Sequence, residues 1–269
     1  MKFVEPAVYL IAKSQLDSTE VRRWLDDLEV KNFEAPQQAT EAEKLTLLAG
    51  KRCYMSFEAG LNPNVSRVRK DIVAFIDNIL SSRHGSVLEH SSYSFAIENV
   101  SRVFTGEMNR HRAGWAVSEG SMRYIRFADI PFWMPHSIRE DTGDSPEIAE
   151  AKRRTREIFE RAFQQMEDHY RELENIWRVD SLKAFNTKKK ITSLMRRIIG
   201  MGVATGGIWT GNLRAIRHVL AVRVDVAAEE EIAYVFGLVL KRLVEAEPTI
   251  FADFEQNEEG FWKPKYWKV

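Results

Sequence analysis

The segment from Glu107 to Tyr124 constrains the fold most, because its residues are poor material for a hydrophobic core. It combines cations with two carboxylates: Glu107, Arg110, His111, Arg112, Glu119 and Arg123. Guanidinium groups bind phosphate through paired hydrogen bonds, and Gly114 and Gly120 let the backbone close on a ligand. The segment therefore predicts an anion site of the kind that nucleotides use. A solvated basic turn is the alternative, which the apolar residues between the charges make less attractive.

Charge and composition limit what such a site can serve. The 269 residues include 39 basic and 39 acidic side chains, so no global field draws the protein to nucleic acid or to an anionic membrane. The anion site must be local. No window approaches the ~18 apolar residues of a membrane span, and the first residues lack the apolar run of a signal peptide. We therefore expect a cytoplasmic protein with no nucleic-acid or membrane partner.

In the first part of the chain, hydrophobic periodicity predicts strands and amphipathic helices in alternation. Residues 91–100 alternate strictly between apolar and small or polar side chains, which is typical of a half-buried strand. The other expected elements are a buried strand over 7–12, a helix capped by Asp17, and helices over 41–53 and 65–82.

In the second part, the Arg-His-Arg run is expected on a helix that also carries Phe104 and Glu107, followed by a loop and a strand over 122–127. A long charged helix should begin at Pro146 and continue to about Asp180; its charged face is either solvated or covers a partner helix. Further helices are expected over 192–204, 212–224 and 229–247, with a break at Gly206 and Gly207. We expect a single domain over 1–269, with a tail at 256–269 that docks on a neighbouring subunit or lies loose.

Three other features allow different chemistry. Cys53 is the sole cysteine, so no internal disulfide is possible; its thiol is either a nucleophile or, more often for such residues, a small buried hydrophobe. His84 and His90 flank a glutamate, but their spacing does not put them on one helical face, so no metal site is predicted. Lysines 188–190 are either a nucleic-acid patch or a solvated helix entrance.

Three separated motifs resemble those of the flavin-dependent thymidylate synthases. Arg110-His111-Arg112, eight residues, Ser121 and then Arg123-Tyr124 is similar to the family signature, whose commonest form is one residue shorter. Residues 101–105 and 212–218 continue the resemblance, which covers roughly residues 6–255. It implies an α+β fold with a twisted, mainly antiparallel sheet flanked by helices. It also implies FAD as cofactor, NADPH and methylenetetrahydrofolate as co-substrates, and homotetramers with shared active sites.

The resemblance further implies roles for individual residues. The flavin-contacting positions would be Ser86, Glu89, Arg110, His111, Arg112, Asn212, Arg214 and His218. The nucleotide-contacting positions would be Glu107, Arg110, Glu119, Ser121, Met122, Arg123, Arg196 and Arg223. The catalytic set would be Arg110 and His111, which keep the reactive flavin nitrogen near the nucleotide, and Arg223, which stabilises negative charge on the pyrimidine. Ser121 is interpreted as a binder, because no general base is placed by sequence to activate it.

The resemblance implies reductive methylation of dUMP to dTMP. The chain lacks an evident nucleophile, which fits a flavin cofactor better than covalent catalysis by a side chain. Departures from the family pattern leave the acceptor open. The signature loop is one residue longer, Ala227 stands where many members have a histidine, His218 where some have asparagine, and Gly200 replaces a common proline. UMP is the alternative acceptor. A nucleic-acid-binding module that uses the same arginines is a more distant alternative, against which the zero net charge argues.

Overall fold

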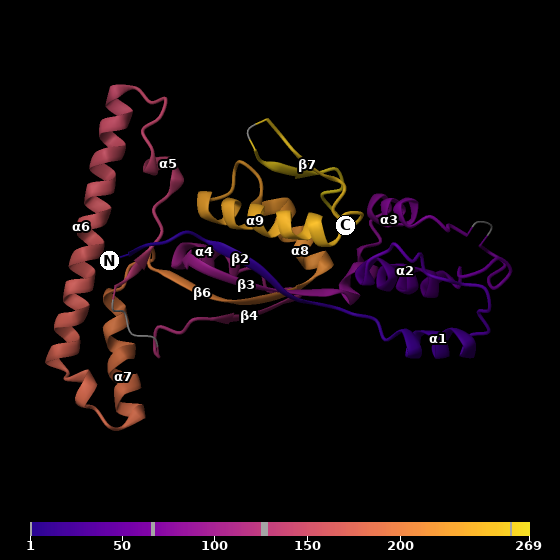
Figure 1. Cartoon of the computed structure of the whole chain (residues 1–269), viewed down its shortest axis with the longest axis horizontal. Helices are drawn as coiled ribbons and strands as arrows, with labels where there is room; N and C mark the ends of the chain where they lie inside the picture. Colours follow the sequence, from indigo (N-terminus) through magenta and orange to yellow (C-terminus); the bar gives the residue numbers. More distant parts are fainter. Residues whose placement is uncertain (1, 66–67, 125–128, 259) are drawn as a thin grey trace.

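The computed structural model of the protein describes residues 2–65, 68–124, 129–258 and 260–269. Figure 1 shows an elongated molecule in which a sheet runs between a long helical hairpin at one end and a group of three helices at the other. The described residues form a four-stranded sheet in the order β2 (Ala7–Lys13), β3 (Ser92–Ser101), β6 (Ala204–Asn212) and β4 (Trp115–Glu119). All its pairings are antiparallel, which confirms the expected sheet.

The alternation predicted for residues 91–100 is confirmed in β3. Tyr93, Phe95 and Ile97 are at most 2% exposed and face the helices. The burial predicted for residues 7–12 is wrong: β2 is an edge strand in which Tyr9 and Ile11 are 55% and 51% exposed. An apolar run does not show whether its strand lies at the centre or at the edge of a sheet, because that depends on pairing with distant residues.

One face of the sheet is covered by α4 (Arg102–Met108), α8 (Leu213–Arg223) and α9 (Glu230–Ala246). Their contact with the sheet centres on the fully buried ring of Phe104, which meets Trp209 edge-on at 6.0 Å and Phe236 at 6.1 Å between ring centroids. The helices predicted over 212–224 and 229–247 are confirmed within a residue at each end. Side chains cap both: Asn212 accepts from the Ala215 N–H, and Glu229 caps α9.

The three helices at the end of the sheet are α1 (Ser18–Asp27), α2 (Glu41–Tyr54) and α3 (Ile72–Ser81). Asp17 caps α1 as predicted, and Thr40 forms a capping box with Glu43 at the start of α2. The third helix is shorter than the predicted 65–82, because the Asp71 carboxylate caps it and sets its start at Ile72. Residues 66–67 of that prediction lie outside the described part.

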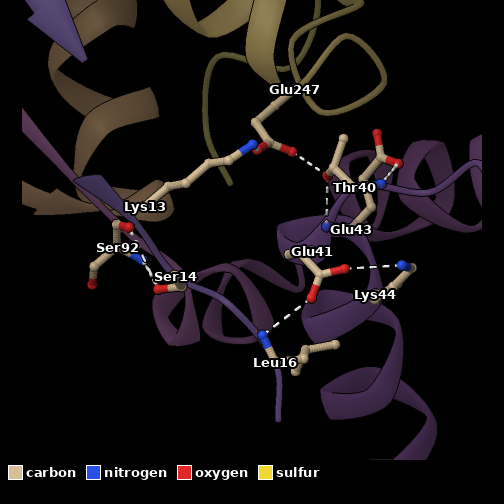
Figure 2. Close-up of polar contacts among 9 residues, drawn as sticks. All are labelled: Lys13, Ser14, Leu16, Thr40, Glu41, Glu43, Lys44, Ser92 and Glu247. Atoms are coloured by element: carbon tan, nitrogen blue, oxygen red, sulfur yellow. Dashed lines mark hydrogen bonds and ion pairs between the residues drawn. The ribbon is translucent and has the colours of Figure 1, made fainter. Parts of the chain in front are cut away.

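Figure 2 shows polar contacts between α2 and the rest of the fold. The Leu16 N–H, just after β2, donates to Glu41 at 3.1 Å. The Thr40 hydroxyl donates to Glu247, which follows α9 and is fully buried. The Nζ atom of Lys13 lies 3.9 Å from the same carboxylate. The start of α2, the end of β2 and the end of α9 therefore meet, and burial raises the pKa of Glu247. The 3₁₀ helix η1 (Gly85–His90) follows α3 and packs against α2 and α8.

At the opposite end, α6 (Pro146–Ile176) and α7 (Phe185–Met195) form the long hairpin. Ser145 caps α6 as predicted, but the helix ends at Ile176 and a 3₁₀ turn, η2 (Val179–Ser181), follows it. Both helices pack on a hydrophobic cluster that is separate from the main core, with buried members Ile130, Tyr170, Val179, Met195 and Val203.

The helix predicted over 192–204 is wrong. After α7 the chain makes a 3₁₀ turn, η3 (Arg196–Ile198), and then enters β6 at Ala204. Gly206 and Gly207 lie inside this strand and do not break it. A Cβ atom on Gly207 would lie 2.4 Å from the Ser118 carbonyl oxygen of β4, so the glycine permits close pairing. Strand β4 was not predicted, since its residues were expected to form a loop.

The remaining elements are short: β1 (Lys2–Phe3), β5 (Pro131–Phe132), α5 (His136–Arg139), β7 (Phe254–Gln256) and β8 (Trp262–Pro264). The β7–β8 hairpin brings the tail back onto its own chain, where the Tyr266 hydroxyl donates to Asp77 at 2.7 Å. Within the described residues, no helix combines the length and the apolar character needed to cross a membrane.

Candidate functional site

The Arg-His-Arg run lies in a turn, and its placement on a helix was wrong. Helix α4 ends at Met108, and the His111 N–H donates to the Met108 carbonyl oxygen at 3.0 Å. Gly114 then adopts φ +73°, in the left-handed region, and the chain reverses into β4. Because the chain must turn here, the side chains of Arg110 and Arg112 are exposed at the end of α4.

Arg223, at the end of α8, joins this turn to the later helix. Its Nη1 atom lies 2.7 Å from Oε2 of Glu107, and its Nε atom donates to Nε2 of His111 at 3.0 Å. The Arg223 side chain is 19% exposed. Three residues that the sequence analysis assigned to the site from two separate motifs are thus in direct contact.

The protonation state of His111 follows from this contact. Partial burial lowers the pKa of the His111 imidazole below its usual 6.5, and the positive charge of Arg223 lowers it further, while Glu107 acts in the opposite direction. His218 stands on the next turn of α8, with its ring centroid 6.3 Å from that of His111. A neutral His111 can accept the Arg223 hydrogen bond, whereas an imidazolium has no lone pair to do so.

A second group lies at the opposite end of β4, around Glu119. Its carboxylate pairs with Arg102 and accepts from Asn109 Nδ2 at 3.2 Å. Arg102 also donates to the Gly120 carbonyl oxygen at 2.6 Å, which holds the start of the Ser121 loop. Burial lowers the pKa of Arg102, and the charge of Arg196 acts in the same direction, so Arg196 lies near this pair.

Arg102 and Asn109 contact a predicted site residue, Glu119, but were not among the predicted site residues. Arg102 stands inside the 101–105 motif that the resemblance included, so a signal was available for it. Asn109 had no signal beyond its position next to Arg110, because its contact with Glu119 depends on how α4 meets β4.

The loop after Gly120, which carries the expected nucleotide contacts Ser121, Met122 and Arg123, packs against α7. The Ser121 hydroxyl accepts from the Arg123 N–H at 3.3 Å, and the Thr192 hydroxyl donates to the Arg123 carbonyl oxygen at 2.7 Å. Met122 packs against the cluster beneath α6 and α7. Residues 122–124 form a turn and not the predicted strand; residues 125–127 of that prediction lie outside the described part.

The positions expected to contact flavin on η1 face the start of α8. Arg214 Nη1 lies 2.6 Å from Oε1 of Glu89, and Arg214 Nε donates to the carbonyl oxygen of Val269 at 3.1 Å. A Cβ atom on Gly85 would lie 2.6 Å from the carbonyl carbon of Val269. The tail therefore covers this segment of its own chain, and Ser86 is exposed beside it.

On a single chain, the predicted nucleotide arginines fall into different groups. Arg223 belongs to the cluster with His111, beside the turn that carries Arg110. Arg196 lies near Arg102, and Arg123 lies in the loop on α7. The last two groups adjoin through Gly120. The structure thus brings the Arg-His-Arg turn against α8 but distributes the arginines expected to contact the nucleotide along the molecule.

The features left open by the sequence also have definite places. Cys53 is exposed, which contradicts its assignment as a small buried residue. It lines a cavity of about 240 Å³ together with Ser86 and Arg214.

Lys189, in the lysine run of α7, lies over the ring of Tyr124, with Nζ 4.8 Å from the ring centroid. Among the described residues, no group of three or more His, Cys, Asp or Glu side chains is arranged to hold a metal ion.

The residues of this cavity suit an anionic dinucleotide. Arg214, in the first turn of α8, lines the cavity and supplies positive charge. The Ser86 hydroxyl lines the same cavity, and the exposed guanidiniums of Arg110 and Arg112 follow on the neighbouring turn. Guanidinium cations and a hydroxyl are donors that bind pyrophosphate, so the residues present fit FAD.

Comparison with known proteins places this site in context. The family model described as Thymidylate synthase complementing protein, Thy1, matches residues 37–249. A flavin-dependent thymidylate synthase of Mycolicibacterium vanbaalenii is 31% identical over 251 residues, which cover 92% of this chain and 89% of the relative. One from Mycobacterium avium is 30% identical over 211 residues, which cover 78% of this chain and 79% of the relative.

Two solved structures have a similar fold. One is a UMP/dUMP methylase, PolB from Streptomyces cacaoi, bound with 5-Br UMP, with a TM-score of 0.65 at 16% identity over 93% of this chain and 94% of that one. The same protein with 5-Br dUMP gives a TM-score of 0.64 at 18% identity over 94% and 96% of the two chains. Because the family model matches most of the chain and relatives about 30% identical cover it nearly end to end, the protein belongs to the flavin-dependent thymidylate synthase family.

Proposed function

We propose that the protein converts dUMP to dTMP by flavin-dependent reductive methylation, with methylenetetrahydrofolate as carbon donor and NADPH as reductant. The observation that carries the proposal is the contact of Arg223 with His111 and Glu107. It joins the family signature to a helix 112 positions further along the chain. A partly buried guanidinium beside a neutral imidazole is suited to stabilise negative charge on a pyrimidine ring.

FAD would be held at the cavity beside η1 and at the turn after α4. The residues proposed for it are Ser86, Glu89, Arg110, His111, Arg112, Asn212, Arg214 and His218. When bound, this cofactor accepts reducing equivalents from NADPH and supplies the hydride that completes the methyl group. Asn212 is engaged as the cap of α8 through Oδ1, so we expect it to approach the cofactor through its amide nitrogen.

The nucleotide would lie between two groups of residues. The loop of Ser121, Met122 and Arg123 would clasp its phosphate, with Arg196 adding positive charge. Arg223 would lie at the pyrimidine. Because water is partly excluded around Arg223, its charge acts more strongly on the ring than an exposed arginine would.

These groups would be completed by a neighbouring chain in a homotetramer. The sheet face opposite the helices supports this proposal, because the paired positions Tyr9, Ala96 and Ile208 form an apolar row on it. Tyr9 and Ile208 are 55% and 44% exposed, and a second copy of the chain would cover them. Light scattering of the purified protein measures this assembly. Residues 1–269 would act as one domain in each subunit, and a cytoplasmic location stays a prediction.

UMP is the second candidate acceptor. The longer loop between Arg112 and Ser121 and the alanine at position 227 alter the surroundings of nucleotide and cofactor, and the structurally similar PolB is a UMP/dUMP methylase. A ribose 2′-hydroxyl needs room and a partner in the site, so turnover on the two nucleotides distinguishes the candidates.

The test begins with an absorbance spectrum of the purified protein. We expect bands of bound flavin, and turnover of dUMP with methylenetetrahydrofolate and NADPH that exceeds turnover of UMP. Stronger turnover of UMP would select the second candidate. If no flavin bands appear even after FAD is added, the proposal fails, and salt-sensitive binding of nucleic acid would then be the property to measure.

A further inference from the structure

The contact between Glu107 and Arg223 has a consequence for how the site works. We propose that Glu107 is a positioning residue, which together with His111 fixes the guanidinium of Arg223 so that its remaining N–H donors face the nucleotide ring. This inference rests on the proposed function and deepens it. The family resemblance implies a direct contact of Glu107 with the nucleotide, whereas the structure assigns its carboxylate to Arg223.

Both residues project from firmly anchored helix ends. Glu107 lies between Phe104 and Met108, both of which are fully buried beneath α9 and the sheet. Arg223 ends α8, where the preceding turn buries Val219 and Leu220. The backbones that carry the two charges are therefore held by the core, and the ion pair forms between positions that packing has already set.

Two acceptors on different atoms orient the guanidinium. A guanidinium carries five N–H donors in one plane. In Arg223, Nε donates to His111 and Nη1 lies against Glu107. A single acceptor would let the group swing about its bond to the side chain. With two acceptors both the plane and the rotation are set, and three donors remain for a ligand.

The negative charge of Glu107 also has an electrostatic role. The side chains of Arg223 and Glu107 are 19% and 32% exposed, so both have lost part of their hydration. A carboxylate at 2.7 Å offsets the cost of desolvating the arginine. An amide at position 107 would keep an oxygen acceptor of the same shape but would lose this charge, so Glu107→Gln separates the charge from the shape.

The central experiment compares Glu107→Gln, Arg223→Gln and the double variant, with Glu150→Gln as the matched control. Glu150 pairs with Arg153 on the exposed face of α6, so that variant should behave like the wild type. We expect Glu107→Gln to lower kcat on dUMP by about 100-fold, the scale of a misplaced catalytic group, with little change in dUMP affinity measured by calorimetry.

The double variant decides whether Glu107 acts through Arg223. If it does, the double variant loses no more activity than Arg223→Gln, because the two residues act as a unit. Additive losses would overturn the proposal. So would a Glu107→Gln variant that binds dUMP weakly but turns it over at the wild-type rate when saturated, which is the result expected of a direct nucleotide contact.

A measurement without any substrate tests the same contact. Glu107 raises and Arg223 lowers the pKa of His111. In an NMR titration of the imidazole, Glu107→Gln should therefore shift the midpoint to lower pH and Arg223→Gln to higher pH, while circular dichroism shows both variants folded at the temperature of the titration. An unchanged midpoint in folded Glu107→Gln would overturn the inference. If the two variants show these shifts but the wild-type protein methylates neither nucleotide, the proposed function is overturned, whereas the contact between Glu107 and Arg223 stands.

Discussion

The Nε atom of Arg223 donates a hydrogen bond to Nε2 of His111 at 3.0 Å, and so the arginine is held in this orientation only while that nitrogen is unprotonated. The family signature and the later helix are coupled at this point. Any change that protonates His111 both removes the acceptor and places two positive charges side by side. This coupling should make the stability of the protein depend on pH, and substitution of His111 should reduce that dependence.

The first prediction concerns the loss of stability at acidic pH. The pKa of His111 is lowered in the folded protein, chiefly by burial and then by Arg223. The unfolded chain therefore takes up its proton first as the pH falls. The stabilising contribution of neutral His111 is complete above the unfolded pKa of about 6.5 and is lost as the pH falls through the folded pKa. The melting temperature of His111→Gln should thus decline less on acidification below that pH than that of the wild type.

His169→Gln is the control for this acid effect, because His169 is exposed on α6. It should follow the wild-type curve. Identical acid slopes for the wild type and His111→Gln would contradict the coupling.

The second prediction concerns Arg102, which holds both the Glu119 carboxylate and the Gly120 carbonyl oxygen. Arg102→Gln should release the start of the Ser121 loop, which we propose binds the nucleotide phosphate, and weaken dUMP binding by about tenfold, the equivalent of one charged hydrogen bond. Calorimetric titration measures the affinity. Arg153→Gln removes an exposed ion pair on α6 and should leave the affinity unchanged; equal weakening in both variants would refute a specific role.

The third prediction compares two glycines. Gly207→Ala would place a methyl group 2.4 Å from the Ser118 carbonyl oxygen, and this overpacking between β4 and β6 should lower the free energy of unfolding by about 1–3 kcal/mol. Gly237 lies inside α9 with open space beside it, so Gly237→Ala should raise that free energy by about 0.5–1 kcal/mol. Urea denaturation measures both, and a Gly207→Ala variant as stable as the wild type would show that β4 and β6 are not so closely paired.

The fourth prediction concerns the buried pair that anchors the tail. The two carboxylate oxygens of Asp253 accept from Arg217 at 2.9 and 2.8 Å, and the Arg217 side chain is 3% exposed. Asp253→Ala should lower the free energy of unfolding by about 3–5 kcal/mol, because it leaves a buried charge unpaired.

Asp141 provides the geometric match for that variant, since it accepts from Arg156 at 2.8 and 2.9 Å on the exposed surface. Asp141→Ala should barely change the denaturation midpoint. If the two aspartate variants lose similar stability, burial is not what makes the Arg217 pair important.

Much of the secondary structure could be predicted because it depends on neighbours in the chain. Asp17 and Ser145 predict the starts of helices because each caps an N–H group no more than three residues further along the chain. The alternation of residues 91–100 predicts a strand because successive side chains of a strand point to opposite faces. The errors occur where distant contacts overrule local pattern. Of the residues predicted as a helix over 192–204, those up to Met195 belong to α7, and the chain leaves the helix so that Ala204 can start β6 opposite Ser101 of β3.

The sequence by itself determined the family signature, its order along the chain, and the residue types available to bind anions. The tertiary structure decided which of them meet. It placed Arg223 against His111 and Glu107, gave Glu119 to Arg102 and Asn109, and laid the tail over Arg214. Capping and periodicity act within a few residues, whereas these contacts join positions that only sheet register and helix packing bring within hydrogen-bonding distance.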